Sequence, residues 1–390
     1  ADMTVEEGMN YYCGSMLSVK DQGVVQYAFP KEQTTKDTYP DFNPYAGNVR
    51  AAASMITPWR TAIIGSLADV VESMTVENLS APSVTDKKQI KEKGWDTAAG
   101  SSSWSWLNGD GVGFEVYKRY VDLSAEMGWK YFIMDEGWAG TDHSKVLENF
   151  PDWMDELVSY AKEKHVELIG WLHISTVYTD EKMEAIFSKM AETGIKGVKI
   201  DFFDSESQWT YKLVDKLSKA CEKHGLVIDY HGIAKPVGER RTYPNVIARE
   251  GVRGNENGNV SAEQDCLLAI SRCAVGPTDF TPLIYGPDVT TNHLGALGVI
   301  MESGIPCFAD TDKKYRESDL FRWYKNMPAA WDETKLLDAS LGDYVNMARS
   351  RRRPRLFGME DEADYAVAWL EAHGLLDDRA FAASVMRSYQ

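Results

Sequence analysis

Strand and helix patterns alternate along residues 100–326 of this chain. Short runs rich in Val, Ile, Leu, Phe and Trp are typical of buried strands, and the stretches between them carry apolar residues at helical spacing. The predicted strands span residues 102–107, 129–134, 166–174, 196–202, 226–231, 245–249, 279–283 and 305–309. The predicted helices span residues 113–127, 153–165, 180–193, 207–224, 265–275, 293–303 and 317–326. Eight strands, nearly all followed by a helix, predict an α/β fold whose parallel sheet closes into a (β/α)8 TIM barrel.

The sequence on either side of this alternation has a different character. Residues 1–85 combine strand-like runs with polar loops, and we expect a small irregular β segment that packs on the barrel as an adaptor. Residues 86–347 hold the predicted catalytic barrel. Residues 348–390 begin with a basic, proline-interrupted run and continue with two helix-like segments, which predicts a basic linker and a helical tail.

Composition and charge narrow the classes of partner. The 390 residues are 44% hydrophobic and 26% charged, the balance of a soluble globular protein. With 42 Lys+Arg against 59 Asp+Glu the net charge is −17, which disfavours nucleic acid or a membrane surface as the main partner and suits a neutral substrate. No apolar run approaches the roughly 20 residues that span a bilayer.

The amino terminus and the cysteines bear on the compartment. The chain starts without a basic stretch followed by an apolar core, so we expect a mature periplasmic or secreted protein whose signal peptide is absent from this chain. Its five cysteines are scattered and show no disulfide framework. We therefore expect buried free thiols at Cys13, Cys221, Cys266, Cys273 and Cys307.

Charged residues lie at the ends of successive predicted strands. Lys199 and Asp201 point to one face of their strand because side chains alternate, and Glu250 and Glu256 follow the strand at 245–249. The carboxyl ends of barrel strands gather at one mouth, so Asp201 and Glu256 are the predicted carboxylate pair of a glycosidase. Lys199 favours the ionised form of Asp201 and thus a nucleophile. The alternative is a structural ion pair for Asp201 and a solvated loop acid for Glu256.

Further side chains at the strand ends are candidates for binding substrate. Asp135 can accept hydrogen bonds from sugar hydroxyls, and Trp138 can stack on a sugar ring, although helix capping is an alternative for such an acid. His231 is a predicted substrate contact because it ends a strand. Lys199 and Lys235 are further candidates, with surface charge as the alternative for Lys235.

The sequence offers oxygen ligands for a metal more readily than nitrogen or sulfur ligands. No His/Cys cluster has the spacing of a zinc site. Calcium needs only carboxylate and carbonyl oxygens, to which Glu250 and Glu256 could contribute, so calcium is a candidate cofactor.

Several of these stretches carry a family resemblance. They are residues 57–60, 128–138, 197–203, 229–236, 241–245, 249–256 and 330–334. Together they resemble glycoside hydrolase family 97, a family of α-glycosidases with a (β/α)8 catalytic barrel. The similarity covers residues 10–347, and the 229–256 block is its most specific part.

The resemblance implies roles for particular residues. The inverting branch of the family places a base glutamate directly after the histidine of the fifth strand, where this chain has Gly232. The retaining branch is therefore implied, with Asp201 as nucleophile, Glu256 as acid/base and Glu250 as a calcium ligand. The expected activity is that of a retaining, exo-acting α-galactosidase-like enzyme that hydrolyses a terminal α-linked hexose of an oligosaccharide or glycoside, with α-glucosidase as the second choice.

Two other readings remain open. Most of the family's amino-terminal β-sandwich and its carboxy-terminal β domain are missing, so a truncated, non-catalytic carbohydrate-binding barrel is an alternative. Residues 368–382 resemble a helical repeat of the RecX recombination regulators, although a plain pair of amphipathic helices explains them equally well. An interaction protein that acts through the basic tail is the weakest reading, because the net charge is −17.

Overall fold

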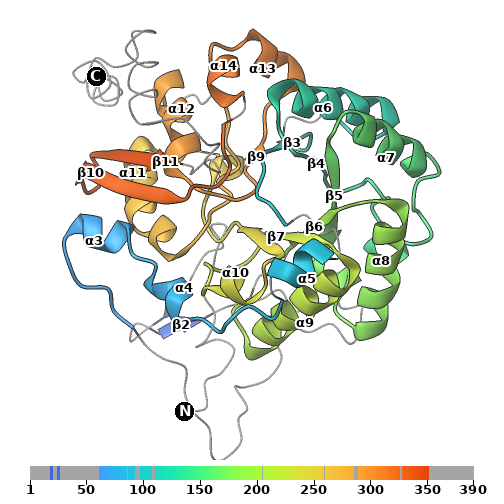
Figure 1. Ribbon diagram of the computed structural model, residues 1–390, viewed down its shortest axis with the longest axis horizontal. Helices are drawn as coiled ribbons and strands as arrows, with labels where there is room; N and C mark the ends of the chain where they lie inside the picture. The colour runs from blue at the N-terminus through green and yellow to red at the C-terminus, as the bar shows by residue number, and fades with distance from the viewer. Residues whose placement is uncertain are drawn as a thin grey trace, which may run out of the picture.

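The computed structural model describes residues 18–20, 24–26 and 61–350, apart from residues 86, 93–96, 108–109, 204, 259, 285–288 and 326. Within this part of the chain the main feature is a sheet of seven parallel strands in the order β8-β7-β6-β5-β4-β3-β9 (Figure 1). The strands are β3 (Ser102–Trp104), β4 (Tyr131–Met134), β5 (Glu167–His173), β6 (Gly197–Asp201), β7 (Val227–Tyr230), β8 (Val246–Arg249) and β9 (Cys307–Phe308). Each of these strands was indicated by its apolar run, so the parallel α/β fold is confirmed.

Helices connect successive strands. They are α6 (Phe114–Met127), α7 (Met154–Glu163), α8 (Asp180–Thr193), α9 (Gln208–His224), α10 (Glu239–Thr242), α11 (Ala262–Ile270), α12 (Thr291–Ile300), α13 (Asp312–Glu317) and α14 (Leu320–Tyr324). The boundaries follow local chemistry. The side chain of Ser207 accepts a hydrogen bond from Thr210 N at the start of α9, and Gly225 ends α9 in a left-handed conformation at φ 69°.

Both faces of the sheet are buried, in two separate apolar layers. Tyr131 and Ile133 belong to one buried cluster, whereas the intervening Phe132 and the following Met134 pack in the other, with the helices. Such alternation within one strand follows from the period of two, and burial of both faces is typical of parallel sheets. No described helix is both long and apolar enough to cross a membrane.

One predicted strand is wrong. Residues 279–283 form no strand, because only single hydrogen bonds tie this segment to its neighbours. Asp279 N donates to Arg249 O at the end of β8 (3.1 Å), and Ala309 N beyond β9 donates to Pro282 O (3.1 Å). The predicted helix at 265–275 is also interrupted, since α11 ends at Ile270 and a 3₁₀ turn, Arg272–Val275, follows.

The flanking segments differ from the sequence prediction. Besides the short antiparallel pair β1 (Ser18–Lys20) and β2 (Val24–Gln26), the described amino-terminal part holds helices α3 (Leu67–Val71), α4 (Thr75–Leu79) and α5 (Lys87–Glu92). A capping box between Ser66 and Asp69 explains why α3 forms where a β segment was expected.

An antiparallel hairpin of β10 (Glu333–Ser340) and β11 (Tyr344–Ser350) lies beside α11 and α3 and was not predicted (Figure 1). The predicted domain boundaries at 85 and 347 stay predictions. The helical tail and its RecX-like repeat lie outside the described residues.

Candidate active site

The strand ends bring the predicted acids together. Register pairs His173 with Asp201 across β5 and β6, and Lys199 with Asp229 across β6 and β7. The loop after β8 carries Glu256, whose backbone N–H donates to Thr281 Oγ1 (3.0 Å). The structure thus assembles the charged residues of β6, β7 and β8 at one edge of the sheet, as parallel strands require.

Asp201 is partly exposed at the end of β6, and each of its carboxylate oxygens accepts one hydrogen bond. Trp171 Nε1 donates to Oδ2 (3.0 Å), and Phe202 N donates to Oδ1 (2.7 Å). Burial raises the pKa of Asp201, whereas the positive charges of His231 and Lys199 oppose that rise. The carboxylate is thereby fixed in orientation.

Lys199 and Asp135 form a buried ion pair beneath Asp201. Lys199 Nζ lies 2.9 Å from Asp135 Oδ2 and 4.1 Å from the ring centroid of Trp104, whose Nε1 donates to the same oxygen (2.6 Å). Burial works against the ammonium, but Asp135 and the other acids raise the pKa of Lys199 well above its ordinary value. Lys199 Nζ and Asp135 Oδ2 are thus already bound to protein groups. Their contact with substrate stays a prediction.

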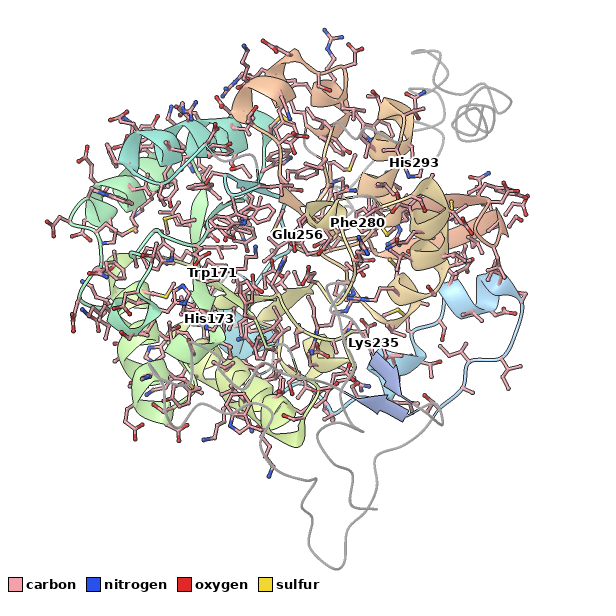
Figure 2. All side chains as sticks on the ribbon, turned by 180° about the vertical axis from the view of Figure 1, so that it is seen from behind. Trp171, His173, Lys235, Glu256, Phe280 and His293 are labelled. Atoms are coloured by element: carbon pink, nitrogen blue, oxygen red, sulfur yellow. The ribbon has the colours of Figure 1, made fainter. Side chains whose placement is uncertain are left out.

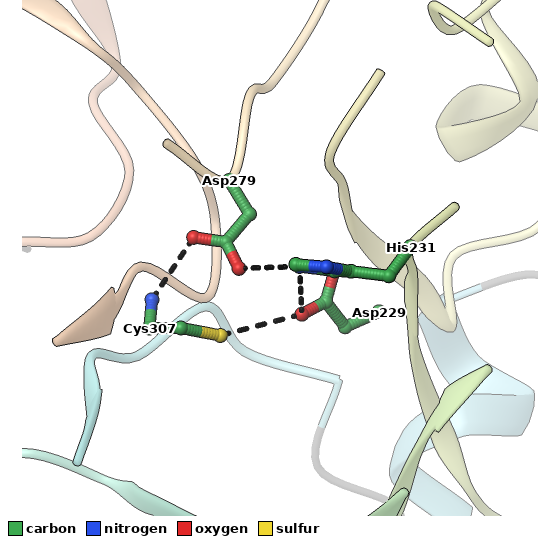
Figure 3. Close-up of side chains that lie close together, drawn as sticks. All are labelled: Asp229, His231, Asp279 and Cys307. Atoms are coloured by element: carbon green, nitrogen blue, oxygen red, sulfur yellow. Dashed lines mark hydrogen bonds and ion pairs between the residues drawn. The ribbon is translucent and has the colours of Figure 1, made fainter. Parts of the chain in front are cut away.

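His231 is the centre of a group of carboxylates. Nε2 lies 2.8 Å from Asp279 Oδ2 and 3.7 Å from Asp229 Oδ2 (Figure 3). On the other side of the ring, Nδ1 lies 3.7 Å from Glu250 Oε2 and 4.0 Å from Glu256 Oε1. Burial and Lys199 lower the pKa of His231, but these acids raise it well above the ordinary value. The imidazole is therefore surrounded by acids that favour its protonated form.

Cys307 completes this group from β9, the strand at the other edge of the sheet. Its thiol lies 3.6 Å from Asp229 Oδ2, and its backbone N–H donates to Asp279 Oδ1 (3.0 Å; Figure 3). One ligand atom from each of Asp229, His231, Asp279 and Cys307 falls within 4.8 Å of the others, a set that sequence spacing did not indicate. Because hydrogen bonds already join these groups, we interpret them as the support of His231.

Glu250 and Glu256 lie next to each other on the Nδ1 side of His231. Glu250 is fully buried and accepts a hydrogen bond from Gly232 N at Oε2 (3.0 Å). Burial raises the pKa of Glu250 well above its ordinary value; His231 opposes the rise, and the charge of Glu256 adds to it. Ligand atoms of Glu250, Glu256 and His231 lie within 4.8 Å of one another, and the two carboxylates among them are oxygen donors of the kind that a hard cation takes.

Gly232 makes room for the carboxylate of Asp201. Its φ is +58°, and a Cβ at this position would lie 2.6 Å from Asp201 Oδ1 and 2.2 Å from Phe202 N. No side chain fits there without displacing the end of β6, since real Cβ contacts under 3.0 Å essentially do not occur. A side chain at position 232 would therefore collide with the backbone of Phe202 as well as with the Asp201 carboxylate.

Comparison with known proteins supports the resemblance. Residues 94–252 match the family model described as Glycoside hydrolase 97. The chain is 35% identical over 317 residues to a probable retaining alpha-galactosidase of Streptomyces bingchenggensis, covering 77% of this chain and 49% of that protein. It is 32% identical over 331 residues to a retaining alpha-galactosidase of Bacteroides thetaiotaomicron, covering 75% and 48%.

The chain thus spans about half the length of the curated relatives that it matches. Among solved structures, a family 97 enzyme from Pseudoalteromonas sp. strain K8 in complex with acarbose is similar, with a TM-score of 0.65 at 24% identity over 75% of this chain and 52% of that one. This likeness shows a shared fold over the matched part of the chain.

The expectation that Trp138 stacks on a sugar is wrong. Its side chain is only 3% exposed, its Nε1 donates to Trp171 O (2.7 Å), and its ring packs edge-on against Phe150. A Trp at a strand end is apolar enough to fill the space between strand and helix, and here it does so. Lys235 is exposed in the loop after β7, away from Trp171 in Figure 2.

Several site residues of the described chain were missed in the sequence. The one signal that could have found Trp171 is that it lies two residues before His173 on β5, on the same face of the strand. Asp279 lies in a segment without periodicity. Arg272 lies behind the site and donates five hydrogen bonds to backbone carbonyls, of Arg249, Glu250, Gly251, Gly276 and Pro277. Burial lowers the pKa of Arg272 to about 10, so it stays charged at neutral pH.

A cavity of about 300 Å³ lies elsewhere, between α3, α4, the 3₁₀ turn after α11 and the β10–β11 hairpin. Glu302 and Arg349 line it, joined by a 2.7 Å ion pair. None of the strand-end acids borders this cavity, so we assign the chemistry to the strand ends.

Proposed function

We propose that this protein is a retaining, α-galactosidase-like exo-glycosidase that removes a terminal α-linked hexose from an oligosaccharide or glycoside. In the first step the Asp201 carboxylate attacks the anomeric carbon while the bond to the leaving oxygen breaks and Glu256 gives that oxygen a proton. In the second step Glu256 takes a proton from water, the water oxygen attacks the anomeric carbon, and the bond to Asp201 breaks. Two inversions retain the configuration.

The observation that carries the proposal is the close approach of Gly232 to Asp201. Members of the inverting branch have a glutamate at that position, and no side chain fits here beside the Asp201 carboxylate. Glu256 is near enough that its charge raises the pKa of Asp201, as expected for two carboxyl groups that flank one anomeric carbon. The names of the two curated relatives, both retaining alpha-galactosidases, support the same assignment.

Covalent trapping tests the nucleophile. A 5-fluoro-α-galactosyl fluoride forms a glycosyl-enzyme that hydrolyses slowly, and we expect one equivalent to label Asp201, as seen by intact mass and peptide mapping. Asp201→Asn removes the attacking charge, so it should take up no label and lower kcat on nitrophenyl α-galactoside by more than 1000-fold. Asp215→Asn, on the exposed side of α9, serves as the matched control and should label fully.

Other outcomes would replace the proposal. Label on another carboxylate would reassign the nucleophile. Turnover of the α-glucoside in place of the α-galactoside would keep the mechanism and change the sugar. A folded protein that binds galactose in calorimetry and turns over neither substrate would be a non-catalytic carbohydrate-binding barrel.

Calcium belongs to the same proposal, with Glu250 as a ligand. A bound calcium ion would supply a fixed positive charge beside the acid/base and relieve the repulsion between Glu250 and Glu256. We expect a calcium chelator to lower the melting temperature by several degrees and to reduce turnover, with both restored by added calcium. Glu250→Gln should abolish the response of the melting temperature, whereas unchanged melting in wild type would exclude the metal.

The wider architecture and location follow from the proposed function. We infer that residues 278–284 take the place of an eighth strand, supported by their hydrogen bonds to Arg249 and Ala309, and so complete a (β/α)8 barrel. A mature enzyme of this kind acts on extracellular or periplasmic sugars, so we propose a periplasmic or secreted location.

A further inference from the structure

A row of three aromatic rings extends outward from the proposed nucleophile. The ring of Phe202 stacks on His173 (centroids 5.3 Å apart, 27° between planes), and His173 stacks on His143 (4.9 Å, 16°). The rings come from the ends of β6 and β5 and from the loop after β4. Trp171, which donates to Asp201, meets both Phe202 and His143 at its edge.

Phe202 is held in a conformation that only its surroundings explain. Its φ is +65°, which is rare for a residue with a side chain and costs on the order of 1–3 kcal/mol. This backbone turns the N–H toward Asp201 Oδ1 and the ring away from the interior, leaving Phe202 46% exposed. An exposed ring beside the nucleophile gains little from burial in the protein and is available to a ligand.

Hydrogen bonds fix the two imidazoles of the row. His173 Nδ1 accepts from Ser175 N (3.1 Å) and contacts Ser175 Oγ (2.6 Å), and His143 Nε2 lies 3.1 Å from Glu136 Oε1. Burial also holds the pKa of His173 down, to about 3, so this ring is neutral and can stack without repelling a ligand. The three stacked rings form a fixed column, and the Glu136 carboxylate at its far end can accept hydroxyl hydrogen bonds.

We propose that the exposed ring of Phe202, supported by His173 and His143 stacked behind it, is the platform of a leaving-group subsite that takes a second hexose by its apolar face; this rests on the proposed function. The buried groups Asp135, Lys199 and Trp104 lie on the inner side of Asp201. Phe202, the ring next to Asp201, is the most exposed of the three. The bond to be broken then lies over Asp201, with the departing sugar on the rings.

The test compares substrates that share a galactosyl group and differ in the leaving group. α-Galactosyl fluoride has nothing to stack, a nitrophenyl galactoside has a flat aryl group, and an α-galactosyl disaccharide has a hexose. We expect Phe202→Ala to lower kcat/KM for the disaccharide about tenfold more than it lowers kcat/KM for the fluoride, whose value absorbs any effect on Asp201 itself. Phe202→Tyr, which keeps the ring, should behave as wild type.

Each result decides the matter. Equal losses on the fluoride and the disaccharide, or no loss on either, would overturn the subsite. A loss confined to the nitrophenyl substrate would make the platform one for aryl groups and overturn the assignment to hexose. Leu337→Ala, which removes a 63%-exposed side chain on β10, should change none of the three.

The fluoride separates this inference from the proposed function, since wild type should hydrolyse it whether or not the platform exists. If wild type turns over no substrate, calorimetry with galactose and the disaccharide still decides. Tighter binding of the disaccharide than of galactose, abolished in Phe202→Ala, would support the platform alone. Equal binding of both sugars would overturn it.

Discussion

At the scale of single residues, two groups compete for one small volume at the end of β6. The Asp201 carboxylate occupies space that any side chain at position 232 would need. The constraint is steric, because a single methyl group at position 232 would already collide with Asp201 and with the backbone of Phe202. This is the sharpest constraint on the proposed mechanism.

Replacement of Gly232 by alanine tests that constraint. The new Cβ must push away Phe202 N and Asp201 Oδ1, and a misplacement of about 1 Å can cost on the order of 100-fold in rate, so we expect kcat to fall at least that far. Steady-state kinetics with α-galactosyl fluoride measures the effect.

The matched control is Gly111→Ala. Its φ is also positive (+84°), but no heavy atom lies within 4 Å of the added Cβ. It should cost about 1–2 kcal/mol of stability and leave kcat near wild type. If Gly232→Ala had the same kcat as Gly111→Ala, the clash with Asp201 and Phe202 would not limit turnover.

At the scale of elements, Arg272 connects the chain leaving β8 to the segment that carries Asp279. Its guanidinium donates to carbonyls at 249–251 and at 276–277, with distances from 2.7 to 3.2 Å. The planar fork of five donors is matched to this set, and no other side chain reproduces it. Glu250 and Asp279, on opposite sides of His231, are therefore positioned by the same residue.

Arg272→Lys should lower the free energy of unfolding by about 2–4 kcal/mol, because a buried ammonium leaves at least two carbonyls without a donor. Denaturant unfolding measures the loss. Arg253→Lys, in the exposed part of the same loop, should change stability by less than about 0.5 kcal/mol. Similar stability of both lysine variants would show that the five hydrogen bonds contribute little.

At the scale of the whole molecule, the sequence predicts the elements that are regular and misses those defined by distant partners. The strands at β4 to β8 and the helices α6 to α9 were predicted because each carries its own period. Residues 279–283 read as a strand, yet they make only isolated hydrogen bonds, and the β10–β11 hairpin was taken for the end of the barrel.

The candidate site divides in the same way. Asp201, Glu256 and Glu250 were predicted because acids after apolar strands stand out, and the structure brings them together around His231. No sequence pattern distinguishes Asp279 and Arg272 from other charged residues, because their partners are distant in the sequence. Trp138 is buried because its large apolar ring gains more from packing in the core than from exposure to a ligand. Buried thiols are confirmed at Cys221, Cys266 and Cys307, while Cys13 lies outside the described residues.

The pairing of β3 with β9 has a consequence for how the molecule is made. Ser102 pairs with Cys307 and Ser103 with Phe308, so this edge of the sheet joins residues about two hundred positions apart. A ribosome adding 5–20 residues per second takes roughly 10–40 s to deliver β9 after β3 has emerged. During that time the hydrogen-bonding edge of β3 is open to other nascent chains. Any truncation before Cys307 would leave that edge open permanently.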